Sequence, residues 1–150
     1  MNSEDEPSLM FLLLSHHKPE KLNRTIHIRI RGKHIYLCAR CTGIWTGAIS
    51  IFLAFFSGLY LPVWLYVLLL MVLPAPALVD WITQSCKIRE SRNIIRTGTG
   101  FLLGVGWGLF LTSLARGMLH LFLIGLVIIC IYTLLVYIIA LKTNFLDNYF

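Results

Sequence analysis

Residues 118–141 read MLHLFLIGLVIICIYTLLVYIIAL, a run that contains no Asp, Glu, Lys or Arg. A helix needs roughly 17–25 mostly apolar residues to cross the hydrocarbon core of a bilayer. Three further stretches meet this requirement, at about 42–61, 63–79 and 98–115. The pattern therefore predicts an all-α membrane protein with four transmembrane helices.

The composition of the whole chain supports this prediction. Apolar residues make up 57% of the 150 residues and charged residues 13%, against about 25% charged residues in soluble domains. A water-soluble domain of this size would expose a large apolar surface, so lipid must be the solvent for much of it. Because the chain has the length of one domain, we expect residues 1–150 to form a single polytopic membrane domain.

The predicted spans pair into two antiparallel hairpins. Residues 57–62 contain turn formers and no charge, so they connect the first two spans tightly. Arg116-Gly117 is the break between the last two spans. The polar segment 80–97 is predicted to be the loop that joins the two hairpins.

Basic residues predict the orientation. They gather in residues 1–41 and in the loop 80–97, whereas the two opposite loops together contain only Arg116. Short loops rich in Lys and Arg stay in the cytoplasm. We therefore expect a multi-pass protein of the cell membrane with both termini and the loop 80–97 in the cytoplasm. Since topology accounts for the excess of 13 Lys and Arg over 7 Asp and Glu, no nucleic-acid partner is expected.

The segment before the first span has a different periodicity. Residues 25–37 read TIHIRIRGKHIYL, in which isoleucines alternate with His or Arg before a Gly-Lys pair. Period-two alternation around a glycine turn is typical of a β-hairpin. We expect a short cytoplasmic β-hairpin within residues 1–41, immediately before the first span.

Two thiols follow this predicted hairpin, in Cys38-Ala39-Arg40-Cys41. Two cysteines at this spacing can bind one metal ion, and nearby backbone N–H groups can stabilise the thiolates. They make half of a tetrahedral site, with zinc as the candidate cofactor. The candidate third ligands are His16 first, then His17, His34, His27 and Cys86. A redox pair and simple packing of the thiols are the alternatives.

The third predicted span contains Gly100, Gly104 and Gly108, which recur every four residues. Such a strip lets a neighbouring helix approach closely, because no side chain separates the two backbones. Helix packing is the favoured interpretation, and the strip is the predicted interface of a homo-oligomer. A groove for a lipid tail or small substrate is the alternative. His120 is the only ionisable residue of the predicted spans, which argues against an ion pump or proton relay.

The polar segment before the third span supplies a second candidate site. Arginines beside a helix N-terminus form a natural anion site, because guanidinium groups and N–H groups face the same ligand. Asp80 is the candidate catalytic residue, as an acid–base group or as an orienting group. In the alternative interpretation, the arginines hold the membrane interface and pair with Asp80 or Glu90. The predicted substrate-binding residues are Arg40, Gln84, Ser91, Asn93 and Arg96.

These motifs occur in an order that resembles a known family. They are Ser15-His16-His17-Lys18-Pro19-Glu20-Lys21, Cys38-Ala39-Arg40-Cys41-Thr42-Gly43-Ile44 with Gly47, Pro76, Asp80, Gln84, Glu90-Ser91, Asn93, Arg96 and Thr99-Gly100 with Gly104. The order resembles the domain of unknown function 2085 family, small integral membrane proteins of bacteria and archaea. The resemblance covers roughly residues 15–108, and C-A-R-C-T-G-I is its most specific part. It implies an architecture and a set of site residues, and no reaction.

Three positions depart from the family pattern. Ser15 stands where the family has a cysteine, Lys21 where it has an arginine, and Trp81 where it has a glycine. The family's Cys-His pair and C-x-x-C together imply a Cys₃His zinc site. This chain keeps His16, Cys38 and Cys41 as predicted ligands, and His17 or water would complete the shell.

Several functions remain open from the sequence. The first is a membrane protein that binds or processes an anionic, phosphate-bearing lipid or small molecule, in which a metal with an open position would activate water. The second is a small oligomeric transporter or flippase that uses the glycine strip as its moving interface. The third is a non-catalytic membrane scaffold subunit that recruits a partner through its basic face. A thiol-redox role is a fourth. In each case membrane lipids are predicted partners.

Overall fold

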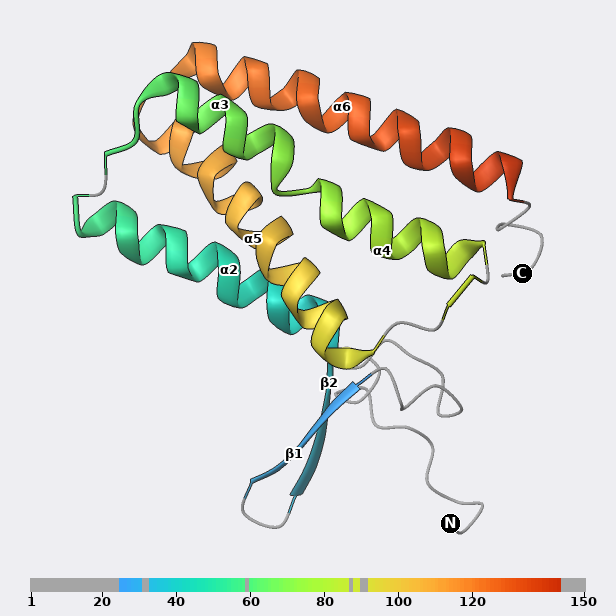
Figure 1. The fold of residues 1–150 in the computed structure, drawn as a ribbon. Coiled ribbons are helices and arrows are strands. Elements are labelled where there is room, and N and C mark those ends of the chain that lie inside the picture. Colours follow the sequence, from blue (N-terminus) through green and yellow to red (C-terminus); the bar gives the residue numbers. More distant parts are fainter. Residues whose placement is uncertain (1–24, 31–32, 59, 87, 90–91, 144–150) are drawn as a thin grey trace, which may run out of the picture.

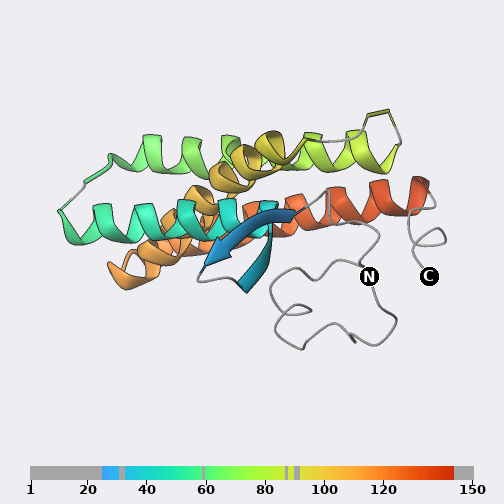
Figure 2. The ribbon, with the colours of Figure 1, turned by 90° about the horizontal axis from the view of Figure 1, so that it is seen from below.

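The computed structural model describes residues 25–30, 33–58, 60–86, 88–89 and 92–143. Within these residues a two-stranded antiparallel sheet precedes five helices (Figure 1). Helix α5 runs obliquely, with α2 on one side of it and α3, α4 and α6 on the other (Figures 1 and 2). The elements are β1 (Thr25–Ile30), β2 (Lys33–Cys38), α2 (Ala39–Phe56), α3 (Val63–Val72), α4 (Ala75–Ser85), α5 (Asn93–Ala115) and α6 (Leu119–Lys142).

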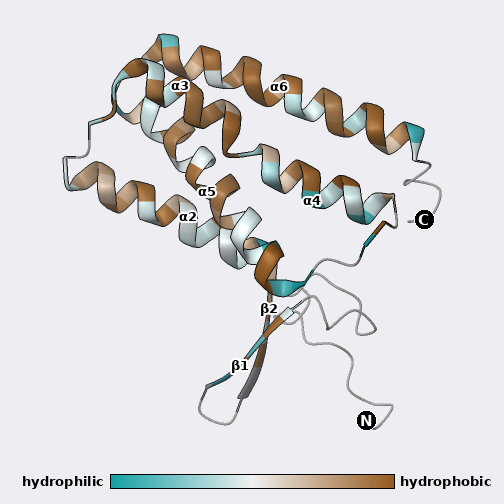
Figure 3. Cartoon of the chain, viewed as in Figure 1, coloured by the Kyte–Doolittle hydropathy of each residue, from teal (hydrophilic) through white to brown (hydrophobic). Residues whose placement is uncertain are grey.

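Four helical stretches of the described chain are long and apolar enough to cross a membrane: Ala39–Phe56, Val63–Ser85, Asn93–Ala115 and Leu119–Lys142. Hydrophobic residues make up most of α3 and α6 in Figure 3, as expected for side chains that face lipid. The predicted architecture of four spans preceded by a β-hairpin is confirmed.

The second span consists of two helices, α3 and α4, which are interrupted at Leu73 and Pro74. Proline has no backbone N–H and its ring disfavours a continuous helix, so it is a common cause of such breaks. The chain resumes its helical hydrogen bonding at once, because N–H groups of Ala77 and Leu78 donate to the Pro74 carbonyl. The break therefore redirects the span without exposing many backbone groups.

The helices extend beyond the predicted spans at the end near the hairpin. The second span continues to Ser85, and the third begins at Asn93. Much of the predicted loop 80–97 is therefore helical. As a result, Arg40, Asp80 and Arg96 belong to membrane-spanning helices, which corrects the expectation that His120 was the only ionisable residue there. Hydropathy windows exclude charged residues, but such residues are tolerated in spans when they pair with one another.

Glycines allow α2 and α5 to pack backbone against backbone. A Cβ atom at Gly104 would lie 2.1 Å from the Ile44 carbonyl oxygen, and one at Gly100 would lie 2.5 Å from that of Arg40. From the other side, a Cβ atom at Gly47 would lie 2.2 Å from the Phe101 carbonyl oxygen. The prediction that the strip serves helix packing is thus confirmed.

The same contacts correct a second expectation. Helix α2 of the same chain covers Gly100, Gly104 and Gly108, so this strip is not the surface on which a second copy would pack. Formation of a homo-oligomer itself stays a prediction.

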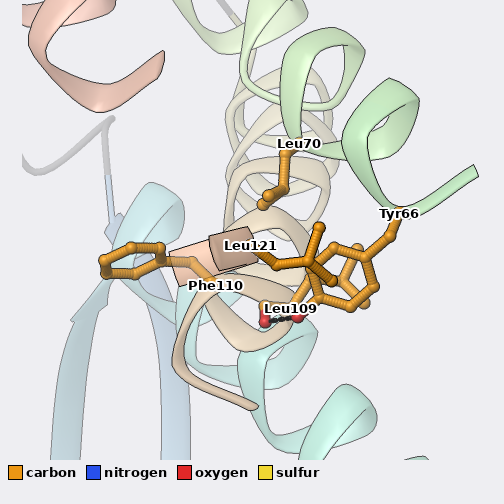
Figure 4. Close-up of a cluster of buried hydrophobic side chains, with 5 residues drawn as sticks. All are labelled: Tyr66, Leu70, Leu109, Phe110 and Leu121. Carbon is orange, nitrogen blue, oxygen red and sulfur yellow. Dashed lines mark hydrogen bonds between the residues drawn. The ribbon is translucent and has the colours of Figure 1, made fainter. Parts of the chain in front are cut away.

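The end of the bundle remote from the hairpin contains the main apolar core (Figure 4). Here the Tyr66 hydroxyl donates a hydrogen bond to the Leu109 carbonyl, which joins α3 to α5. Leu121 is 1% exposed between these helices. The remaining members of this cluster are Leu70 and Phe110. The core holds α3, α5 and α6 together at this end.

The hairpin extends from the opposite end, where α2 and α5 begin (Figure 1). Thr25 pairs with Cys38 at its base, and His27 stacks on Tyr36, with ring centroids 4.8 Å apart. The last residue of β2 is directly followed by the first residue of α2. The hairpin is therefore fixed to the first span without an intervening linker.

Candidate functional site

A buried carboxylate lies near the end of the bundle that carries the hairpin. Asp80 of α4 is 1% exposed. Its Oδ2 accepts hydrogen bonds from Nη2 of Arg40 at 2.5 Å and from Nε2 of Gln84 at 2.7 Å. Its Oδ1 lies 3.4 Å from Nη2 of Arg89. A buried charge is tolerated only when it is paired and hydrogen-bonded, and both oxygens of Asp80 meet this condition.

The hydrogen-bonded chain continues from α4 to α5. Oε1 of Gln84 accepts a hydrogen bond from Nη2 of Arg96 at 2.6 Å. Arg96 is 6% exposed and lies in the first turns of α5. Gln84 can bridge Asp80 and Arg96 because residues four apart on a helix face the same side. We call Arg40, Asp80, Gln84, Arg89 and Arg96 the polar cluster; it joins three of the four spans.

The polar cluster is rich in positive charge. It contains three guanidinium groups and one carboxylate. The side chains of Arg40 and Arg89 are 27% and 42% exposed, respectively. Nε of Arg40 is buried and has no hydrogen-bond partner within the described part of the chain. Guanidinium groups present several N–H donors in a fixed plane and bind carboxylates or phosphates well. The cluster is thus suited to bind an anion beside Arg40 and Arg89.

Asn93 lies beside the cluster but contacts the hairpin. Its Nδ2 donates a hydrogen bond to the Thr25 carbonyl at 3.1 Å. One turn later, Thr97 donates to the Ala39 carbonyl at 3.2 Å. These two bonds attach the base of the hairpin and the start of α2 to α5. Oδ1 of Asn93 is buried and makes no hydrogen bond to any described residue.

The two thiols of the C-x-x-C segment lie at the junction of β2 and α2. Cys38 is buried and Cys41 is half-buried, and the side chains are close enough for a thiol–thiol hydrogen bond. All four cysteines lie in the described ranges, and none forms a disulfide there. Across those ranges no three His, Cys, Asp or Glu side chains are grouped so that they could hold a metal ion. The described residues thus supply no third ligand beside Cys38 and Cys41, and zinc binding stays a prediction from the sequence.

Four of the predicted site residues come together in the polar cluster: Arg40, Asp80, Gln84 and Arg96. They come from three helices that are separate in the sequence. Asn93 is the first residue of α5, before Arg96, and its side chain binds the hairpin. Ser91, predicted to bind substrate, and His16, predicted to bind metal, lie outside the described residues.

Arg89 is a member of the cluster that the sequence analysis did not include among the substrate-binding residues. The alternative interpretation of the segment, in which its arginines pair with Asp80 or Glu90, applies to Arg89, which pairs with Asp80. Arg89 follows the end of α4 in a segment without helical periodicity. No spacing in the sequence therefore distinguishes it from Arg92.

A cavity of about 370 Å³ lies between α3, α4, α5 and α6 and reaches Arg40 of α2. This volume is within the range of roughly 300–1,000 Å³ that is usual for small-molecule sites. Its walls are mostly apolar and include Pro74, Trp107 and Phe110. Arg40 is the one charged residue among the lining residues of the described chain. The cavity and the polar cluster therefore share a residue.

The fold and the cluster define a class of protein: a small four-span membrane protein with a charged cluster buried at one end of its helices. The chain belongs to the family described as predicted membrane protein (DUF2085), whose model matches residues 16–110. An uncharacterized protein of Methanothermobacter thermautotrophicus is 34% identical over 112 residues, which are 75% of this chain and 96% of the relative. No solved structure matches the chain. The family match includes the C-x-x-C segment and the whole polar cluster and ends before α6.

Proposed function

We propose that this membrane protein binds the anionic, phosphate-bearing head group of a lipid at its polar cluster. The observation that carries this proposal is a buried carboxylate of a candidate membrane span that pairs with Arg40 and Arg89 and is bridged to Arg96 by Gln84. Ionisable residues inside spans are costly, so they commonly mark a functional site. Phosphate oxygens suit the planar N–H donors of guanidinium groups. A lipid head group would reach this cluster from the membrane surface.

The contacts suggest a role for each member. Asp80 was predicted to act as an acid–base group or as an orienting group, and its hydrogen bonds to Arg40 and Gln84 favour the orienting role. Arg40 and Arg89, which are partly exposed, would contact the phosphate directly. Arg96 lies deeper and would add positive charge beneath it.

We propose that the protein lies in the cell membrane and that the end of the bundle with the hairpin and the polar cluster faces the cytoplasm. The basic residues of the hairpin, of the cluster and of the segment between α4 and α5 lie at this end, whereas Arg116 lies at the other. An excess of Lys and Arg in short loops keeps those loops on the cytoplasmic side. The cluster would then face the anionic lipids of the cytoplasmic leaflet.

We also propose that Cys38 and Cys41 bind zinc together with a ligand from the N-terminal segment, His16 first. The support is the proximity of the two thiols at the junction of the hairpin and the first span. Two thiolates and one imidazole are common zinc ligands, and a closed tetrahedral site of this kind stabilises a fold. Here the residues would fix the N-terminal segment beside α2.

A transport role is a second candidate. The observation that favours it is the interruption of the second span at Leu73 and Pro74, because broken spans beside a cavity are frequent in transporters. Flux of lipid or anion through reconstituted liposomes tests this role directly. If well-folded protein shows no such flux, the transport role is excluded and only the binding role remains. The scaffold role stays a prediction from the sequence.

The experiment for the main proposal compares lipid retention by purified protein in a mild non-ionic detergent, measured by native mass spectrometry. We expect wild-type protein to retain phosphatidylglycerol in preference to phosphatidylcholine. Arg89→Gln should abolish this preference while the fold is kept, because Arg89 is partly exposed. Arg29→Gln removes the same charge from an exposed position of the hairpin and should preserve the preference. An equal effect of both variants would show that the preference depends only on the net positive charge of the protein, which would contradict the proposal.

A further inference from the structure

We propose that the cavity between α3, α4, α5 and α6 holds a single hydrocarbon chain of the anionic lipid whose phosphate is bound beside Arg40. This inference rests on the proposed function and adds the substrate class: an anionic amphiphile with one chain inside the protein. It is carried by three features of the cavity, namely its continuity with the polar cluster, the chemistry of its walls and its place among the spans.

Arg40 connects the two parts of this site. Its guanidinium group donates to Asp80 in the polar cluster, and the same side chain lines the cavity. A ligand that enters the cavity therefore meets a positive charge at one boundary and apolar walls elsewhere. This distribution matches a molecule that has one anionic end and one long apolar part.

The hydroxyl groups on the α6 wall of the cavity already donate hydrogen bonds within the protein. The Tyr132 hydroxyl donates to the Met71 carbonyl at 2.5 Å, and the Thr133 hydroxyl donates to the Ile129 carbonyl at 2.9 Å. Both hydroxyl groups thus have backbone acceptors already, and they offer little to a polar ligand. A soluble phosphate compound would leave most of this volume without favourable contacts, whereas a methylene chain would fill it with dispersion contacts.

Small residues keep the volume open. Gly106 and Gly125 line it, together with Ala77. Gly106 lies on a different face of α5 from the strip that packs on α2, because a Cβ atom there would lie 3.7 Å from Pro74 and not against α2. The glycines of α5 therefore divide between two tasks: one set brings α2 close, and Gly106 leaves room beside the break in the second span.

The position of the cavity within the candidate spans brings it next to the hydrocarbon chains of the membrane. Its walls belong to α3, α4, α5 and α6, all of which are parts of candidate membrane spans. In a bilayer, hydrocarbon chains are the surrounding solvent of these helices. Thr133 is exposed and also lines the cavity, so the α6 side is a place where a chain can enter from the membrane.

The test uses Thr133→Trp, which places a large side chain into the cavity from an exposed position. Leu134→Trp is the matched control, because Leu134 is 58% exposed on the same helix and does not line the cavity. The full-length protein in non-ionic detergent is titrated with three probes: lysophosphatidic acid, the uncharged monoacylglycerol of the same chain, and glycerol phosphate. Binding is followed by native mass spectrometry.

We expect wild-type protein and Leu134→Trp to bind lysophosphatidic acid equally, and Thr133→Trp to bind it at least about tenfold more weakly, because loss of a few buried methylene groups already has this effect. Equal binding by the two tryptophan variants would overturn the chain site. Equal binding of glycerol phosphate and lysophosphatidic acid by wild-type protein would also overturn it, because the ligand would then be a soluble anion. If Thr133→Trp unfolds, Val136→Phe, which narrows the same cavity, gives the decisive comparison.

The probes also separate this inference from the proposed function. If monoacylglycerol binds as tightly as lysophosphatidic acid but Thr133→Trp weakens both, the phosphate site fails and the chain site stands. If lysophosphatidic acid is preferred and Thr133→Trp has no effect, the phosphate site stands and the chain site fails.

Discussion

Nη2 of Arg40 lies 2.5 Å from Oδ2 of Asp80, and this contact joins the first turn of α2 to the middle of α4. The two residues are 40 positions apart in the sequence. Arg40 also lines the cavity, so one side chain links the hairpin-bearing span, the buried carboxylate and the apolar volume. The arrangement of the candidate site therefore depends on the charge of Asp80.

We expect Asp80→Asn to destabilise the protein, because it would leave the guanidinium groups of Arg40 and Arg89 without the carboxylate that pairs with both. Removal of one partner from a buried ion pair costs about 3–5 kcal/mol in soluble proteins. The measurement is unfolding by denaturant in detergent micelles. Ser85→Ala, which removes a hydrogen bond to the Trp81 carbonyl on the same helix, should cost far less.

The double variant Asp80→Asn/Arg40→Gln isolates the pair. It should recover part of the lost stability, because Arg40 no longer carries a charge that has lost its partner. Together with the single variant Arg40→Gln it completes the double-mutant cycle that gives the interaction energy. Asp80→Asn with wild-type stability would show that the cluster is not a folding element.

The α2–α5 interface gives a second prediction. Gly104→Ala should separate α2 from α5, because the new Cβ atom would lie 2.1 Å from a backbone oxygen that has no side-chain flexibility. We expect a cost of at least about 1–3 kcal/mol, the usual range for overpacking. Unfolding in detergent measures it.

Gly98→Ala is the matched control on the same helix. No atom lies within 4 Å of a Cβ at this position, so the change should be neutral or stabilise the helix by up to about 1 kcal/mol. Similar destabilisation by both substitutions would contradict the backbone contact between the two helices.

The number and place of the spans could be predicted from sequence because a lipid environment requires long apolar stretches, and residues 118–141 meet that requirement without a charged side chain. The ends of the spans could not be predicted in the same way. Asp80 can lie within a span because its charge is paired with Arg40, and only the folded structure brings these two residues together. Hydropathy scores each residue without its partner, so it ended the predicted second span before Asp80, whereas the helix continues to Ser85.

The glycine strip shows a similar limit. Its spacing predicted close packing, and Gly43 and Gly47 repeat that spacing in the first span. This shared spacing is the sequence signal that could have identified α2, and not a second copy of the chain, as the partner of the strip. The cavity had no such signal, because it depends on how far α6 lies from α4 and α5, and α6 is hydrophobic along most of its length (Figure 3).

The zinc hypothesis leads to a third prediction. Protein purified in mild detergent should contain about one zinc per chain by elemental analysis, since a single C-x-x-C contributes to one tetrahedral site. Cys38→Ser/Cys41→Ser should lose the metal, and Cys130→Ser, an exposed thiol of α6, should retain it. His16→Ala should lower the metal content if His16 is the third ligand. Wild-type protein without stoichiometric metal would leave thiol packing or a redox pair, and alkylation of the thiols in cells separates these two.

Orientation is the fourth prediction, and it can be tested at the two ends of the bundle in the same cells. Cys86 is exposed at the end of α4 that lies near the polar cluster, and Tyr60 is 74% exposed at the opposite end. In a chain whose other cysteines are replaced by serine, Cys86 should react with a membrane-impermeant maleimide only after the cells are permeabilised. With Cys86 replaced as well, Tyr60→Cys should react in intact cells.

The physical reason is that the basic residues flanking Cys86, Arg89 and Arg92 among them, resist translocation, whereas Arg116 is the one basic residue in the short connections at the other end. The reverse labelling pattern would place the polar cluster outside the cytoplasm. In that case the cluster would meet the lipids of the outer leaflet, and the preference for anionic head groups would need to be tested against that composition.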